Sequence, residues 1–240
     1  MISPSIPTSA VRRPADLAGV RRTLAGIGLV GAAVTGLVSA VIGAEEGTDT
    51  SAADLYRIAA RSQGALAASA VVFMASAVLM IPALGGMLHQ LRRRGAVLGL
   101  VGAVFWVLGA FGHLGYATWE LMVASVPHTG DRPQMVAYLD RASTVPAILL
   151  PLLLSVVVGM LLLVLALWRA DRVPLWVLVL VIVGIAFEMG AETVGWQSRT
   201  VPIVSWACAA VVFGYIGVGV LRTTTGEWRA LGRDDPSSEA

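Results

Sequence analysis

Four ionisable side chains lie within or at the ends of long apolar stretches of this chain: Glu120, Glu188, Glu192 and His113. A carboxylate is costly in the hydrocarbon core of a bilayer, so an ionisable residue there indicates proton transfer, ligand binding or ion pairing. Burial in an apolar pocket favours the protonated form of a carboxyl, which is the form that a general acid requires. We therefore predict acid–base chemistry with three candidate catalytic residues, Glu120, Glu188 and Glu192. For Glu192, a solvated position among lipid head groups is the alternative.

Aromatic residues accompany these acids. One face of a predicted helix carries a stripe whose members recur at steps of three and four residues: Trp106, Gly109, His113, Tyr116 and Glu120. Glu188 and Glu192 lie one helical turn apart in another apolar stretch. The faces of aromatic rings attract cations, so rings near a general acid would stabilise a developing carbocation. The predicted substrate-binding residues are Trp106, His113, Tyr116, Trp119, Phe187 and Trp206.

Six apolar stretches must position these residues: 22–44, 63–89, 97–125, 144–168, 174–191 and 201–221. Each is near or above the roughly 18–20 residues that a helix needs to cross a bilayer, and a bilayer interior excludes open strands. Only 13% of the residues are charged, against roughly 25% in soluble domains. The sequence therefore predicts an all-α fold, a six-helix transmembrane domain over 22–222, and disordered cytoplasmic tails over 1–21 and 223–240. Small residues at 39–44 leave signal-peptide cleavage as an alternative to a retained first helix.

The placement of arginine predicts the orientation. Arginines occupy the N-terminal tail, the loops after the second and fourth stretches, and the C-terminal tail, whereas the opposite loops are acidic or mixed. By the positive-inside rule, both termini are cytoplasmic, and we expect a multi-pass protein of the cell (plasma) membrane. Arg57 and Arg61 are exceptions on the outer side. The three glutamates then fall in the outer half of the bundle, where we expect Glu120 and Glu188 to face one cavity.

Several classes of function are excluded or unsupported. The formal net charge is only +2, so no electrostatic footprint for nucleic acid exists. The chain has no lysine for a Schiff base, and its one cysteine, Cys208, cannot form an internal disulfide. Neither G-x-S-x-G nor H-E-x-x-H occurs. The three histidines are scattered over a helix end, a mid-helix and a loop, so we expect no metal site and no cofactor.

Two segments carry a resemblance to a known family: W-E-L-M at 119–122 and F-E-M-G-A-E at 187–192. Together with the span pattern, they resemble the small integral-membrane terpene cyclases of meroterpenoid and indole-terpenoid pathways. The resemblance implies that Glu120 or Glu188 protonates an alkene or epoxide of a prenylated substrate, which is isomerase or lyase chemistry on a hydrophobic isoprenoid-type molecule. The fungal members have seven spans and usually an aspartate as the second acid, whereas this chain has six apolar stretches and glutamates.

A non-enzymatic membrane protein is the alternative, either a small transporter or an accessory subunit that binds a lipid or a partner. The acids would then move protons, or Glu120 and Glu188 would pair with Arg57 or Arg61 to lock the bundle. Broken helices mark the sites of transporters. The sequence places candidate interruptions at Pro82–Gly86 and at Pro146 with Pro151.

Overall fold

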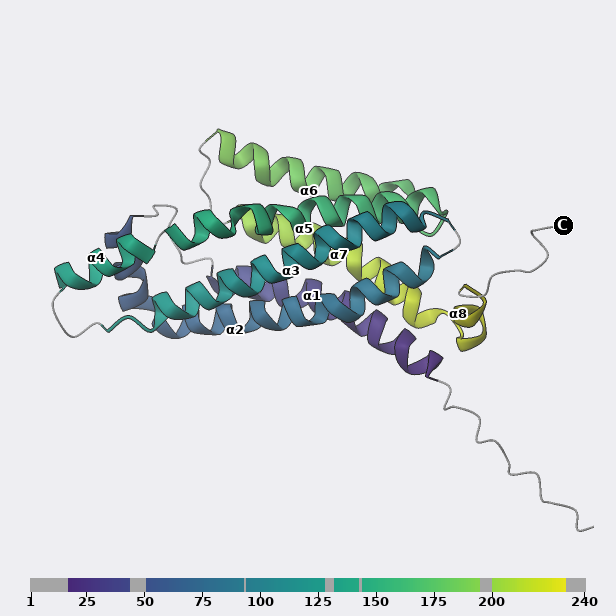
Figure 1. Ribbon diagram of the computed structural model, residues 1–240, viewed down its shortest axis with the longest axis horizontal. Helices are drawn as coiled ribbons and strands as arrows, with labels where there is room; N and C mark the ends of the chain where they lie inside the picture. Colours follow the sequence, from purple (N-terminus) through teal and green to yellow (C-terminus); the bar gives the residue numbers. More distant parts are fainter. Residues whose placement is uncertain are drawn as a thin grey trace, which may run out of the picture.

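The computed structural model describes residues 17–43, 51–92, 94–127, 132–142, 144–194 and 200–231, without the side chain of Glu192. All regular structure in these ranges is helical, as predicted. The helices are α1 (Ala18–Gly43), α2 (Ala52–Gln90), α3 (Ala96–Ala124), α4 (Arg132–Ala142), α5 (Thr144–Arg169), α6 (Leu175–Thr193), α7 (Thr200–Arg222) and α8 (Thr225–Leu231). The long helices run along one axis, with α4 at one end of the bundle and α8 at the other (Figure 1). These ends are called the α4 end and the α8 end below.

Among the described residues, five helical stretches are long and apolar enough to cross a membrane: α1, α2, α3, Arg132–Arg169 and α7. The apolar part of α6, Leu175–Ala191, is shorter than 18 residues. Five of the six predicted spans therefore have helices of sufficient apolar length. The span predicted at 174–191 stays a prediction. Large apolar side chains cover the outside of the bundle, with Val97 81% and Ile148 74% exposed. Such a surface is suited to lipid rather than to water.

Close packing between α3 and α5 depends on glycine. A Cβ atom on Gly159 of α5 would lie 2.5 Å from the backbone nitrogen of Trp106, and one on Gly109 of α3 would lie 2.4 Å from the Cβ of Val156. No side chain fits at these contacts, so the two backbones approach closely, as is common between helices in membranes. The α3–α5 pair forms one wall of the bundle.

The predicted helix interruptions are wrong. Pro82 lies inside a helical part of α2, and Pro151 lies inside α5. Helices in membranes tolerate proline where neighbouring helices support the freed backbone groups. Here α1 approaches Pro82 closely, because a Cβ on Gly28 would lie 2.8 Å from the proline ring. Pro146 is in the first turn of α5, where proline is acceptable.

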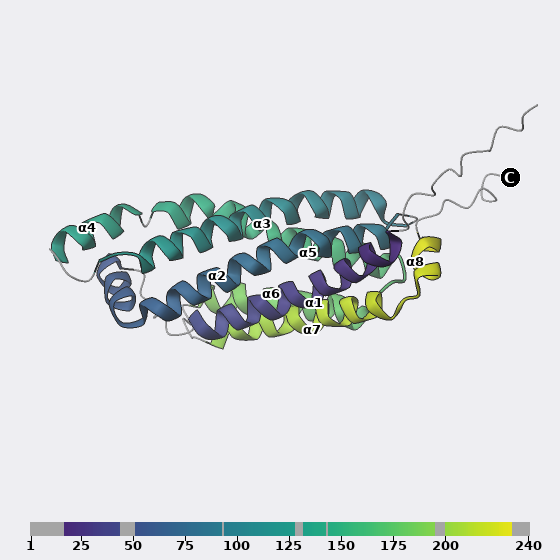
Figure 2. The same ribbon diagram turned by 90° about the horizontal axis from the view of Figure 1, so that it is seen from below.

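The α4 end contains a small second core. The backbone of α2 leaves helical geometry at Ser62 (φ −130°, ψ 31°), and the turns before this kink are directed across the long axis of the bundle (Figure 2). This first part of α2 packs with the end of α3 and with α4. The sequence had predicted a loop between the third and fourth apolar stretches, where the structure has α4. The buried members of this cap core are Tyr56, Ala59, Leu66, Val123, Ala124, Val126 and Leu139. Burial of Leu139 against α2 and α3 explains why α4 is held in place.

At the α8 end, part of the predicted disordered tail is helical. Thr224 and Glu227 cap α8 reciprocally, since the Thr224 backbone N–H donates to Glu227 at 2.7 Å and the Glu227 N–H donates to the Thr224 hydroxyl at 3.2 Å. Trp228 is buried and stacks on His89 with ring centroids 4.1 Å apart. The predicted N-terminal tail, 1–21, overlaps α1 from residue 18 onward. The parts of the two predicted tails over 1–16 and 232–240 lie outside the described residues.

Cysteine labelling at the two ends tests the predicted orientation. In a chain carrying Cys208→Ala, Arg94→Cys introduces one thiol at the α8 end and Ser125→Cys introduces one at the α4 end, both at exposed positions. We expect a membrane-impermeant maleimide to label Ser125→Cys in intact cells and Arg94→Cys only after lysis, because the positive-inside rule predicts a cytoplasmic location for the arginine-rich end. Labelling of Arg94→Cys in intact cells would contradict the predicted orientation and indicate the opposite one.

Candidate functional site

A cavity of about 420 Å³ lies inside the bundle, between α1, α2, α3, α5, α6 and α7. This bundle cavity is lined mostly by aliphatic side chains. Its aromatic lining comprises Phe73, Trp106, Tyr116, Trp206 and Phe213. Its polar lining comprises Ser76, His113, Glu188, Ser205 and Cys208. Enclosed apolar volume with few convergent polar groups is typical of a small-molecule site.

Glu188 is the carboxyl of this cavity. It lies on α6, is half-buried, and accepts a hydrogen bond of 2.6 Å from the Ser205 hydroxyl of α7. The bond joins the two helices at the cavity wall and restricts the rotation of the carboxyl group. The arrangement places one oriented acid against a surface that is mostly aromatic and aliphatic.

His113 is buried at 6% exposure in the same lining. Its Nδ1 lies 2.8 Å from the Gly109 carbonyl oxygen. A carbonyl only accepts, so Nδ1 carries a proton, and a neutral ring then has its lone pair on Nε2. A neutral imidazole therefore offers Nε2 as an acceptor in addition to its structural hydrogen bond.

Aromatic rings surround His113 closely. Its ring centroid lies 4.7 Å from that of Phe73 and 6.2 Å from that of Trp206. Phe73 also meets Tyr116 edge-on at 6.4 Å and Trp206 edge-on at 5.9 Å. The sequence had not singled out Phe73, because a phenylalanine among aliphatic residues carries no signal of a site. It is central to the ring cluster that the structure brings together.

Two tryptophans of the lining are fixed by the backbone of other helices. A Cβ on Gly36 of α1 would lie 2.1 Å from the Trp206 ring, so the ring occupies the space that a side chain would fill. The indole N–H of Trp106 donates to the Met80 carbonyl at 3.3 Å. Phe213 meets Trp106 edge-on at 5.4 Å. Both indoles therefore have defined positions at the cavity wall.

Glu120 is not among the residues that line the bundle cavity. It is 7% exposed and lies on the last turns of α3, one turn before Val123 of the cap core. The predicted shared cavity therefore holds for Glu188, His113 and Tyr116 but not for Glu120. Arg57 pairs with Asp54 on its own helix. The pairing of Glu120 or Glu188 with Arg57 or Arg61 stays a prediction.

Two further predicted residues, Trp119 and Phe187, are not among the residues that line the cavity. Trp119 packs against the cap core and donates its indole N–H to the Ala142 carbonyl at 3.2 Å. Phe187 is half-buried next to Glu188 on α6 but does not line the cavity. The backbone of Glu192 belongs to α6, and its side chain is outside the described part of the chain.

Within the described residues, no group of three or more His, Cys, Asp or Glu side chains is placed to hold a metal ion. No protein-family model matches the chain, and no curated protein or solved structure is significantly similar to it. The resemblance to terpene cyclases therefore stays a prediction.

Proposed function

We propose that the protein is an acid-initiated membrane terpene cyclase that binds a prenylated substrate in the bundle cavity and protonates it with Glu188. One observation carries this proposal: a carboxyl oriented by Ser205 lines a cavity whose walls are mostly aromatic and aliphatic. The cavity volume of about 420 Å³ lies within the roughly 300–1,000 Å³ that small-molecule sites occupy.

The chemistry begins with proton transfer from the Glu188 carboxyl to an alkene carbon or an epoxide oxygen of the substrate. The carbocation that forms is attacked by another double bond of the same molecule, which closes a ring and moves the positive charge. The ring faces of Trp106, Tyr116 and Trp206 stabilise that charge through their quadrupoles. Loss of a proton then ends the reaction, so the product has the same elemental composition as the substrate.

His113 is the proposed acceptor of the final proton. Its Nδ1 donates to the Gly109 carbonyl, so Nε2 of the neutral ring can act as a base. The proton balance closes when the imidazolium returns a proton to the Glu188 carboxylate, directly or through water. An acid and a base on one cavity need no cofactor for this isomerisation.

Conversion of a prenylated phenol and of its terminal epoxide by membranes that contain the protein tests the proposal. We expect cyclic products with the mass of the substrate. Products from neither compound would contradict the cyclase. Retention of the substrate in the purified protein without conversion would favour the alternative of a lipid-binding accessory protein.

Trp206→Ala should change the ratio of products while turnover continues. A desolvated cation–π contact of about 2 kcal/mol corresponds to a roughly 30-fold change in the ratio of two competing products. Trp168→Ala is the matched control, since Trp168 is 37% exposed on α5 and does not line the cavity. Identical product profiles for the two variants would show that Trp206 does not guide the cation.

A further inference from the structure

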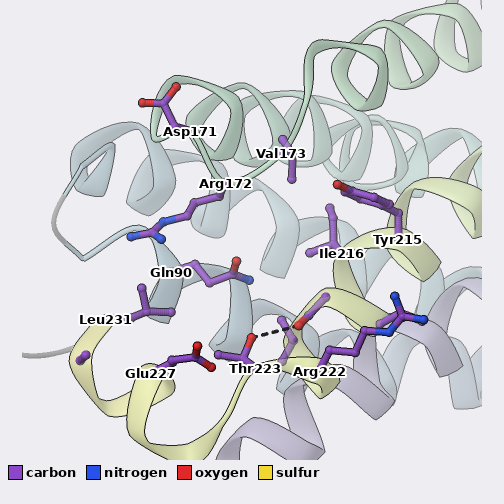
Figure 3. A pocket seen from close by; sticks show the side chains of 14 residues that line it. Gln90, Asp171, Arg172, Val173, Tyr215, Ile216, Arg222, Thr223, Glu227 and Leu231 are labelled. Atoms are coloured by element: carbon purple, nitrogen blue, oxygen red, sulfur yellow. Dashed lines mark hydrogen bonds between the residues drawn. The ribbon is translucent and has the colours of Figure 1, made fainter.

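A second cavity, of about 820 Å³, lies at the α8 end of the bundle, apart from the bundle cavity (Figure 3). Its walls come from the end of α2, the loop between α5 and α6, the last turns of α7, and α8. The lining residues used below are Gln90, Asp171, Arg172, Ile216, Arg222 and Glu227. This end cavity is independent of the proposed enzymatic function.

Several polar side chains of the end cavity offer hydrogen-bond donors to a ligand, although the Thr223 hydroxyl is already bonded to the Gly219 carbonyl oxygen. The side-chain nitrogen of Gln90 is buried and has no hydrogen-bond partner within the described part of the chain. The guanidinium groups of Arg172 and Arg222 likewise form no ion pair with a described residue. Gln90 and Arg172 extend into the space between the α5–α6 loop and α8 (Figure 3). A buried donor without an acceptor is costly, so a ligand with acceptor oxygens would stabilise this site.

The charge at this end favours an anion. Asp171 points away from Gln90 in Figure 3 and pairs with Arg94 at 3.5 Å. Glu227 accepts from the Thr224 backbone N–H, and this bond together with that to the Thr224 side chain lowers its pKa. Arginines outnumber these two acids among the described residues of the α8 end: Arg21, Arg22, Arg92, Arg94, Arg169, Arg172, Arg222 and Arg229.

The position of the end cavity favours a lipid. It lies where α2, α5 and α7 end and α6 begins, which is the limit of the apolar helical stretches. Polar residues share its wall with apolar ones, namely Val173, Ile216, Val220 and Leu231. A ligand for this wall needs a charged head and an apolar body. Basic pockets between helices at this depth suit the head groups of anionic lipids.

We propose that the end cavity binds the head group of an anionic phospholipid of the phosphatidylglycerol type. Phosphate oxygens accept hydrogen bonds from Gln90 and Arg172, and Arg222 at the rim contributes positive charge. The glycerol hydroxyls donate to the Glu227 carboxylate, which no phosphate oxygen can satisfy. This pairing gives each group of the cavity a complementary group on the lipid.

Native mass spectrometry of the full chain in a neutral detergent tests the proposal. The protein is titrated with phosphatidylglycerol, phosphatidylethanolamine, phosphatidylcholine and, separately, inorganic phosphate. We expect the tightest binding for phosphatidylglycerol and the weakest for phosphatidylcholine, which lacks both the net charge and a donor. Removal of both arginines, as Arg172→Gln with Arg222→Gln, should weaken phosphatidylglycerol binding about 25-fold, or about fivefold for each arginine.

A matched control removes two arginines from the opposite end, as Arg57→Gln with Arg61→Gln, and should leave binding unchanged. If the control variant loses as much phosphatidylglycerol affinity, the loss reflects the net charge of the protein and not a specific site, which would contradict the proposal. Equal binding of phosphatidylcholine, or displacement of the lipid by millimolar phosphate, would overturn the lipid as ligand. Gln90→Leu should also weaken binding. If Gln90→Leu lowers the unfolding temperature, its effect on binding cannot be separated from its effect on folding. The test then depends on the variant that lacks the exposed residues Arg172 and Arg222.

Discussion

Glu188→Gln should lower cyclase turnover by ~10²–10⁴-fold, the usual contribution of a positioned general acid. Glutamine keeps the size and polarity of the side chain, and it can still bond to Ser205, but it has no acidic proton to give. Initial rates of cyclisation by membranes, divided by the amount of inserted protein, measure the effect. Binding of the uncyclised substrate should change far less than turnover, since the cavity walls are unaltered.

Two further variants separate catalysis from structure. Glu120→Gln alters a buried carboxyl outside the bundle cavity and should leave the rate within a few-fold of the unmodified protein. Ser205→Ala removes the bond that orients Glu188 and should reduce the rate without abolishing it, as a positioning residue does. Full activity of Glu188→Gln would end the proposed mechanism. If Glu120→Gln loses activity and Glu188→Gln does not, Glu120 is the general acid in place of Glu188.

Gly159→Leu should destabilise the bundle by about 3 kcal/mol, the upper part of the range for overpacking. A Cβ on Gly159 would lie 2.5 Å from the Trp106 backbone nitrogen and 2.9 Å from the Gly102 carbonyl oxygen. These atoms belong to the backbone of α3, so α3 and α5 would have to separate. Unfolding in mixed micelles of increasing dodecyl sulfate content, followed by circular dichroism, measures the loss.

Gly214→Leu on α7 is the control, because a Cβ there would meet no atom within 4 Å. It should unfold at nearly the same dodecyl sulfate content as the unmodified protein. Gly159→Ala should fall between the two, since it adds one methyl group. Equal stability of all three variants would show that α3 and α5 do not pack as closely as described.

The length of the apolar stretches predicted the long helices of the bundle. It did not predict the helical segments that are rich in polar residues. The apolar stretch 63–89 covers most of α2. The first part of α2 contains Arg57 and Arg61, so it is not an apolar stretch and was not predicted as helix. The kink at Ser62 separates this part from the rest of α2. The capping pair Thr224 and Glu227 is readable in the sequence as T-x-x-E, so α8 could have been predicted. α4 is harder to find, since it depends on burial of Leu139 against distant helices.

Helical spacing predicted part of the candidate site. Trp106, His113 and Tyr116 line the bundle cavity together, as their common face indicated. Glu120 continues the same spacing, but at about 1.5 Å per residue it lies roughly 21 Å along α3 from Trp106. It is therefore level with the cap core, not with the cavity. Spacing identifies a face of a helix, and it leaves the height of each residue relative to other helices undetermined.

The neighbourhood of α1 and α7 constrains the order of events during biosynthesis. These are the first and last long helices, and they pack against each other where Gly26 and Gly217 meet. At roughly 5–20 residues per second, ribosomes need about 10–40 s to extend the chain from the end of α1 to the end of α7. Once α2 has been made, α1 can pack against it, but α1 lacks its second neighbour until α7 follows. Since α7 supplies Ser205, Trp206 and Phe213 to the lining, the wall of the bundle cavity is complete only after α7 has packed against α1.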